Sequence, residues 1–384
     1  MPKTITSTKL APFARVAQVS AACLAAVVFL SACAPSPLVP FSTQGPPLVM
    51  VPAGQAAVVD QRARFREVFC AVLEARKEQI EDYRPCDEAL TRLDGEPSAG
   101  SGRPVELGAS KRRLVALVVP GVGYKCFEPW LQPPGTAQRH VARFGYDMGL
   151  LTVDPLSGTA RNARMIRDAL MAMPAQQEGG AQPHIVLVGY SKGTPDILEA
   201  LATYPEIHDR VAAMVSVAGA VGGSPLANDA TQDQANLIQH FPGASCDTGD
   251  NGAVEALRPQ VRRAWLAQHP APARQPVRYF SLVTLPHPER VSLILRGSRN
   301  KLAQIDGRND SQVIFYDQIV PGSTLMGYLN ADHWAIAVPL NRTKAAIAAT
   351  FVTQNAYPRE ALLEAVLRFV EEALSSTAGA RPPL

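Results

Sequence analysis

The stretch from His184 to Leu201 constrains the fold of this 384-residue chain more than any other part of the sequence. Its residues 185–188 are all apolar, and such a run predicts a strand that is buried on both faces. Ile197, Leu198 and Leu201 then recur at the spacing of one helix face. The sequence therefore predicts a strand and a helix that are separated by only a few residues.

The turn between them reads Gly189-Tyr190-Ser191-Lys192-Gly193, a G-x-S-x-G pattern. Its two glycines allow a turn that is too tight for side chains at those places. Such a turn lifts the serine out of the sheet and places its hydroxyl at the amino end of the helix. In this strand-turn-helix setting the pattern predicts that Ser191 is a nucleophile. The alternative is a glycine-rich turn with a helix-capping serine, which needs no partner histidine.

Apolar strands and helical patterns alternate along most of the chain. Continuous apolar runs predict further strands at 114–119, 150–153, 211–217, 277–285 and 324–329, and helical patterns fall at about 137–144, 160–173 and 360–374. Strands that are apolar throughout, with helices between them, are typical of a parallel sheet covered on both faces. The sequence therefore predicts the α/β class with a mostly parallel sheet.

A separate helical pattern precedes this sheet. Residues 59–95 place Phe65, Phe69 and other apolar side chains on one face of a helix. Gly95 to Gly108 is rich in glycine, serine and proline, and this composition predicts a boundary. We therefore expect a small N-terminal helical cap at 59–95 and a main domain at 111–384.

The amino terminus has the features of an export signal. An apolar run at 16–30 follows several basic residues; it is short for a membrane span and has the size of a signal-peptide core. It ends in Leu30-Ser31-Ala32-Cys33, which resembles the lipobox of bacterial lipoproteins. The resemblance implies a signal peptide at 1–32 and a lipid anchor on Cys33, and the following Ala34 favours the outer membrane, facing the periplasm. The alternative is an ordinary secretory signal with an incidental cysteine.

Residues 33–58 are rich in proline and predict an extended tether. The formal net charge of +3 is that of Lys3, Lys9 and Arg15, because residues 1–33 contain no acidic residue and the rest of the chain is balanced. A balanced chain gives no electrostatic reason to expect nucleic-acid binding.

The cysteines that would remain after export predict disulfides. Of the six in the sequence, Cys23 lies in the signal and Cys33 is the predicted anchor, which leaves Cys70, Cys86, Cys126 and Cys246. An even number in an exported protein indicates two bridges. Cys70 and Cys86 lie in one local helical segment, so we favour that pairing, which leaves Cys126 with Cys246. No pair has the C-x-x-C spacing of a metal site.

Because the G-x-S-x-G turn, a nucleophile elbow, occurs together with this strand pattern, residues 114–374 resemble the α/β-hydrolase family, specifically bacterial lipases and esterases. That resemblance implies a Ser-Asp/Glu-His triad in this order along the chain. Residues 221–270 lie where the family often inserts a lid over the active site, and their Gly, Asn and Asp content suits a mobile cover. A surface insertion without a gating role is the alternative.

A histidine after the acid must serve as the base. His333 follows the apolar run at 324–329, at the edge where open α/β sheets bind their ligands, and is the predicted base. The other candidates fit less well, since His140 and His184 precede the nucleophile and since His240, His269 and His287 lie in loops or in the insertion.

Two aspartates compete for the role of the acid. The segment Asn309-Asp310-Ser311-Gln312-Val313 resembles the Asn-Asp-Gly-x-Val segment that carries the acid in bacterial lipases, with Ser311 in place of glycine. Asp317, which also precedes an apolar stretch and a Val-Pro, is the rival. Asp310 leaves more chain before His333, enough for a short helix and the final strand. We therefore favour Asp310 and keep Asp317 open.

The resemblance also implies two backbone donors for an oxyanion. One is the N–H of Lys192, directly after the nucleophile. The other comes from the loop after the strand at 114–119 and corresponds to Val122. Pro120 stands where many lipases have histidine, and Gly121 lets the backbone approach closely.

Together these features predict a serine hydrolase that cleaves carboxylic esters, lipase- or esterase-like, through an acyl-enzyme. The expected substrate is a hydrophobic or lipid ester, met at a bacterial cell envelope to which Cys33 anchors the chain; the oligomeric state stays open. An acyltransferase with the same triad and a non-catalytic envelope lipoprotein with the same fold are the alternatives. The sequence holds no glycine-rich phosphate loop and no metal constellation, so we expect no cofactor.

Overall fold

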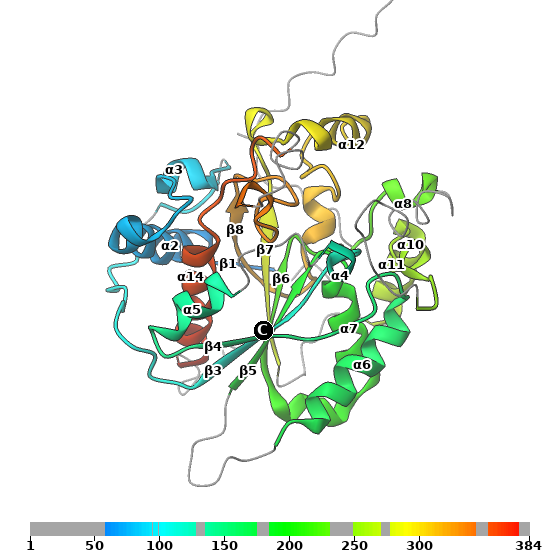
Figure 1. Cartoon of the computed structure of the whole chain (residues 1–384), viewed down its shortest axis with the longest axis horizontal. Helices are drawn as coiled ribbons and strands as arrows, with labels where there is room; N and C mark the ends of the chain where they lie inside the picture. The colour runs from blue at the N-terminus through cyan, green and yellow to red at the C-terminus, as the bar shows by residue number, and fades with distance from the viewer. Residues whose placement is uncertain are drawn as a thin grey trace, which may run out of the picture. The chain divides into compact units, whose positions relative to one another are not determined.

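The computed structural model describes residues 58–93, 95–98, 100–127, 135–174, 184–230, 249–269, 277–342 and 352–375. They form a twisted sheet with helices on both faces (Figure 1). No helix in these ranges combines the length and the apolar composition that a membrane crossing requires.

The sheet has eight strands within the described residues, and nearly all of them run parallel. Along the sheet the order is β1-β8-β7-β6-β5-β3-β4, and only β2, which pairs with β8, is antiparallel. The strands are β1 (Val59–Asp60), β2 (Leu90–Thr91), β3 (Leu114–Val119), β4 (Asp147–Leu150), β5 (His184–Tyr190), β6 (Val211–Val217), β7 (Arg278–Thr284) and β8 (Thr324–Leu329). The predicted α/β class with a mostly parallel sheet is confirmed.

Two layers of helices bury the two faces of the sheet (Figure 1). On one face lie α2 (Arg62–Arg76), α5 (Thr136–Ala142) and α14 (Arg359–Ser375); on the other lie α6 (Thr159–Ala172) and α7 (Gly193–Thr203). The central strand β5 contributes to both cores: Val186 and Val188 pack in the cluster that includes α14, while Ile185 and Leu187 pack with α6 and α7. This double burial is the reason why the run at 185–188 is apolar throughout.

Shorter helices surround this framework. They are α3 (Cys86–Ala89), α4 (Tyr124–Phe127), α8 (Leu226–Asp229), α10 (Ala253–Ala256), α11 (Pro259–Gln268) and α12 (Arg296–Leu302). Of these, α8, α10 and α11 belong to the predicted insertion at 221–270, whose middle part lies outside the described residues.

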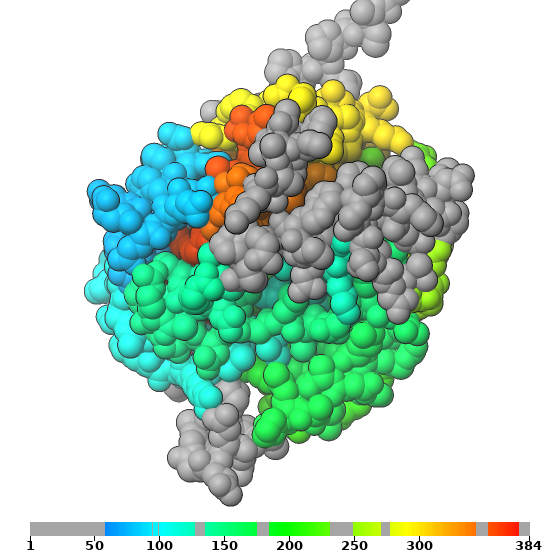
Figure 2. Space-filling view, in the orientation of Figure 1, coloured from blue at the N-terminus to red at the C-terminus, as the bar shows by residue number. Residues whose placement is uncertain are grey.

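The N-terminal segment differs from the expected cap. Its helix α2 packs against β8 and α14, and β1 and β2 extend the sheet at β8, so the segment is built into the main fold. The rings of Phe65 and Phe369 meet edge to face at 5.7 Å between centroids, which joins the two ends of the described chain. The blue and red surfaces that adjoin in Figure 2 are these two segments. Strands of two residues are too short for a periodic signal, so the sequence did not predict β1 or β2.

One predicted disulfide is present. Cys70 of α2 is bonded to Cys86 at the start of α3, with Cα atoms 5.2 Å apart. The predicted partner of Cys126, Cys246, lies outside the described residues, and so do the signal at 1–32, Cys33 and nearly all of the tether at 33–58. Those expectations stay predictions.

The strand order reverses between β3 and β5. From β3 the chain adds β4 on one side, and then β5, β6, β7 and β8 follow in turn on the other side. Val119 pairs with Gly189, so the loops that follow β3 and β5 leave the sheet side by side. Ligands of open α/β sheets bind in the crevice at such a reversal, and both loops carry predicted site residues.

Candidate active site

Ser191 stands at the tight turn between β5 and α7. Its φ of 53° is in the left-handed region, which is unusual for a residue with a side chain and matches a strained elbow. A Cβ at Gly189 would lie 2.7 Å from Thr194 Cα, and one at Gly193 would lie 2.0 Å from the carbonyl oxygen of Val119. Both glycines of the motif are therefore required by close packing of the backbone.

Hydrogen bonds fix both the backbone N–H and the backbone carbonyl of Ser191. Its N–H donates to Val217 O at 3.2 Å, and its carbonyl accepts hydrogen bonds from Thr194 N and Ala220 N, each at 3.1 Å. The elbow is thus fixed by α7 and by the end of β6.

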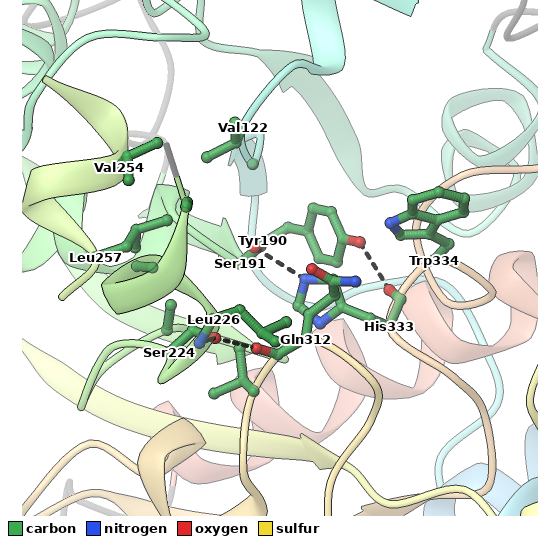
Figure 3. A pocket seen from close by; sticks show the side chains of 15 residues that line it. Val122, Tyr190, Ser191, Ser224, Leu226, Val254, Leu257, Gln312, His333 and Trp334 are labelled. Carbon is green, nitrogen blue, oxygen red and sulfur yellow. Dashed lines mark hydrogen bonds between the residues drawn. The ribbon is translucent and has the colours of Figure 1, made fainter. Parts of the chain in front are cut away.

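The structure brings Ser191, His333 and Asp310 into one hydrogen-bonded series (Figure 3). Ser191 Oγ lies 2.9 Å from His333 Nε2, and His333 Nδ1 lies 2.7 Å from Asp310 Oδ2. An ionised carboxylate only accepts hydrogen bonds, so Nδ1 carries the proton in the neutral ring and Nε2 is left to accept from the serine hydroxyl. This arrangement can draw a proton from Ser191.

The loop after β8 positions His333. Its backbone N–H donates to Asp310 O at 3.0 Å, and its carbonyl accepts from the phenol of Tyr190 at 2.7 Å (Figure 3). The Tyr190 and His333 rings also pack at 5.2 Å between centroids. Burial, and after it the negative charges of Asp310 and Asp332, holds the pKa of Tyr190 well above its usual value, so the phenol stays protonated and can donate. Tyr190 thus connects the elbow to the histidine loop.

Both oxygens of the Asp310 carboxylate are supplied with donors. Oδ1 accepts from the backbone N–H groups of Gln312 at 2.9 Å and Val313 at 2.7 Å. Oδ2 accepts from the Thr284 hydroxyl and from Gln318 Nε2 at 3.2 Å, in addition to His333. Asp310 itself is fully buried. These donors fix the orientation of the carboxylate toward His333.

The rival acid, Asp317, is placed elsewhere. It lies in a short 3-10 helix, Phe315–Gln318, with its carboxylate against Gly222, where a Cβ would approach Oδ1 to 2.1 Å. Burial raises the pKa of Asp317 to about 7, with the charge of Arg263 opposing the shift. Of the two predicted aspartates, only Asp310 meets His333.

The two predicted oxyanion donors flank the nucleophile. Gly121 approaches the elbow so closely that a Cβ there would lie 2.9 Å from Ser191 Cβ. Neither the N–H of Val122 nor that of Lys192 donates a hydrogen bond to any residue in the described part of the chain. Within these residues both N–H groups are therefore left without an acceptor.

A cavity of about 220 Å³ opens over Ser191 and His333. Its walls are largely apolar, and Figure 3 shows Leu226, Val254 and Leu257 of the insertion opposite Trp334 of the histidine loop. Polar groups are few and include Ser224, whose hydroxyl donates to Gln312 O. The insertion at 221–270 therefore contributes a wall of the site.

Several residues of this site had no signal in the sequence. Tyr190, Thr284 and Gln318 are ordinary residues of strands and loops, and only the folded chain shows that they meet His333 or Asp310. That Trp334 lines the cavity is likewise seen only in the folded chain. Among the described residues no cluster of three or more His, Cys, Asp or Glu side chains could hold a metal ion.

Known structures resemble the chain closely enough to identify its family. The metagenomic carboxyl esterase MGS0156 is 38% identical over 86% of this chain and 97% of the esterase, with a TM-score of 0.77. The mature lipase BlEst2 of Bacillus licheniformis is 24% identical over 61% of this chain and 89% of the lipase, with a TM-score of 0.48. No protein-family model and no curated protein matches the sequence.

More than a third of the aligned residues of MGS0156 and this chain are identical, and the alignment spans most of both chains. The similarity therefore shows a shared family and not only a shared fold. It agrees with the strand-elbow-helix at Ser191 and with the sheet order. The chain therefore belongs to the α/β-hydrolase family of carboxyl esterases and lipases, and it is a serine ester hydrolase.

Proposed function

We propose that Ser191, His333 and Asp310 form a catalytic triad that cleaves carboxylic esters through an acyl-enzyme. The observation that carries the proposal is the continuous series of hydrogen bonds from Ser191 Oγ through both ring nitrogens of His333 to Asp310 Oδ2. A serine hydroxyl is a weak nucleophile until such a base accepts its proton.

In the first step Ser191 Oγ attacks the ester carbonyl carbon, and its proton moves to His333 Nε2. The carbonyl oxygen becomes an oxyanion, which the N–H groups of Val122 and Lys192 stabilise. The C–O bond to the alcohol then breaks, and the alcohol leaves with the proton from Nε2. Water repeats the sequence on the acyl-enzyme and releases the carboxylic acid, while Asp310 keeps the imidazole in its orientation throughout.

The cavity favours an ester with an apolar part. Leu226, Val254 and Leu257 line the cavity and would remove apolar surface of a ligand from water. We propose hydrophobic esters as the substrate class.

The test is the Ser191→Ala variant, assayed with p-nitrophenyl butyrate and with a fluorophosphonate probe that labels activated serines. We expect loss of turnover and of labelling with an unchanged melting temperature. Ser224→Ala is the matched control, because it removes another hydroxyl from the same cavity and should still be labelled. Turnover by Ser191→Ala at the wild-type rate would exclude the triad.

We further propose that the chain is exported as a lipoprotein of the bacterial cell envelope, anchored through Cys33 in the outer membrane. The basic residues before the apolar run at 16–30 and the sequence Leu30-Ser31-Ala32-Cys33 support this. A Cys33→Ser variant should leave the membrane fraction, and mass spectrometry of the mature N-terminal peptide should show a diacylglyceryl group only in the wild type. The predicted Cys126–Cys246 bridge is tested by peptide mapping without reduction.

A further inference from the structure

We propose that a buried chain of polar groups behind the elbow positions the two oxyanion donors, and that Lys192, Asp196 and Asn162 are its positioning residues. The inference rests on the proposed function, because it gives a role to side chains that hold the N–H groups of Lys192 and Val122. None of these three side chains lines the cavity, so they act through the backbone and not on the substrate.

The chain begins with an ion pair inside the protein. Lys192 and Asp196 are each only 1% exposed. Lys192 Nζ lies 2.7 Å from Asp196 Oδ1 and 2.9 Å from Oδ2, across one turn of α7. The Cα of Lys192 carries both this anchored side chain and the proposed N–H donor, so the ion pair restricts rotation of the peptide unit that must face the oxyanion.

Asn162 of α6 extends the chain to a neighbouring loop. Its Nδ2 donates to Asp196 Oδ2 at 2.8 Å and to Asp154 O at 3.1 Å, while its Oδ1 accepts from Asp154 N at 3.1 Å. The Asn162 side chain therefore hydrogen-bonds both the N–H and the carbonyl of Asp154 and connects that residue to α7.

Pro155, the next residue of that loop, hydrogen-bonds the residue that follows Val122, the second proposed donor. Pro155 O accepts a hydrogen bond from Gly123 N at 3.3 Å, and Gly123 directly follows Val122. Hydrogen bonds, together with the covalent step from Asp154 to Pro155, thus connect Lys192 through Asp196 and Asn162 to Gly123 N, in the peptide unit that follows Val122. Because an oxyanion hole requires both donors at a fixed separation, a connection between them has a direct catalytic consequence.

Stability alone does not explain this ion pair. Burial raises the pKa of Asp196 even though Lys192 and Asn162 act in the opposite direction, so the fold disfavours its charged form relative to water. A second buried cation, Arg262 of α11, also faces Asp196, and burial lowers the pKa of Arg262 to about 10. Buried pairs of this kind are commonly replaced by apolar residues without loss of stability.

The experiment replaces the buried ion pair by apolar residues. The double variant Lys192→Met/Asp196→Leu replaces both charges by apolar side chains and keeps the Lys192 N–H. We expect it to fold with a somewhat lower melting temperature, because Arg262 loses the nearby charge of Asp196, while kcat for p-nitrophenyl butyrate falls about 10- to 100-fold and KM stays within about threefold. Affinity for a trifluoromethyl ketone, which forms an oxyanion on the serine, should fall by the same factor as kcat.

Asn162→Ala leaves both charges of the ion pair in place and removes the Asn162 hydrogen bonds to Asp196 and to Asp154. It should lower kcat and the ketone affinity together by a smaller factor than the double variant does. This variant carries the test if the double variant does not fold.

Arg368→Met is the matched control. It removes the cation of another buried pair one helix turn apart, that of Arg368 with Glu364 in α14, outside the cavity lining. It should lower the melting temperature with kcat and ketone affinity unchanged.

A stably folded double variant with the wild-type kcat would overturn the inference, and so would a fall in kcat without a matching loss of ketone affinity. Failure of the proposed function has a different signature, since it requires turnover by Ser191→Ala. An inactive Ser191→Ala together with fully active Lys192, Asp196 and Asn162 variants excludes only the positioning role.

Discussion

Asp310 and Asp317 lie in the same segment between β7 and β8, but Asp310 is fully buried and Asp317 is half-buried, and their surroundings differ. The carboxylate of Asp310 accepts hydrogen bonds from backbone, hydroxyl, amide and imidazole groups. For Asp317 the described residues supply no hydrogen-bond donor to the carboxylate, and burial raises its pKa to about 7. Burial without donors thus favours the protonated form of Asp317, whereas the Asp310 carboxylate is surrounded by hydrogen-bond donors and contacts the imidazole.

The largest expected effect is that of Asp310→Asn. The amide cannot serve as the same acceptor for His333 Nδ1–H, so the ring adopts the wrong tautomer, and kcat should fall about 10⁴-fold with little change in KM. Steady-state kinetics measure this directly. Asp317→Asn is the matched control and should retain kcat within about threefold, since Asp317 does not contact His333. Equal losses in the two variants would contradict the assignment of the acid.

Thr284→Val tests whether the donors around Asp310 matter. The substitution is close to isosteric and removes one hydroxyl donor from Asp310 Oδ2. We expect kcat to fall roughly tenfold, because a hydrogen bond to a charged group contributes about 1.5–3 kcal/mol. A variant with unchanged kcat and an unchanged melting temperature would show that the remaining donors suffice.

Asp317→Asn should change the pH dependence of stability. In the folded protein the pKa of Asp317 is about 7, above the ordinary 3.8, so the fold favours the protonated form. The stability that protonated Asp317 contributes is fully present below pH 3.8, the ordinary pKa, and is lost as the pH rises through about 7, the pKa in the fold. The variant should therefore gain melting temperature relative to the wild type between pH 5 and pH 8, as measured by thermal unfolding across that range. Parallel curves would mean that Asp317 is not protonated by burial.

Ser311→Gly is expected to have the smallest effect. Ser311 lies between Asp310 and its backbone donors, with a φ of 83° and an Oγ that is buried without a hydrogen-bond partner. Glycine adopts this conformation without strain, so the variant should be more stable by about 1 kcal/mol in denaturant unfolding, with kcat unchanged. A loss of kcat would show that the serine side chain supports the Asp310 turn.

The local pattern of the sequence was sufficient for the framework, and it singled out two residues that the structure brings into contact. Strands at 114–119, 211–217 and 324–329 were predicted with the bounds that β3, β6 and β8 have, because strands buried on both faces are apolar throughout. Ser191 and His333 were predicted because each follows such a strand, at the edge where parallel strands end together. Boundaries were less accurate where a strand is partly exposed: β4 begins at Asp147, before the apolar residues that predicted it.

Tertiary structure decided what depends on residues far apart in the chain. The sequence kept Asp310 and Asp317 as rivals because both precede apolar stretches, and only the folded loop shows which carboxylate meets His333 and the donors from Thr284 and Gln318. The pairing of β1 and β2 with β8 likewise left no periodic signal. A strand or helix is encoded by its own apolar period, whereas a hydrogen bond between distant side chains exists only after the chain has folded.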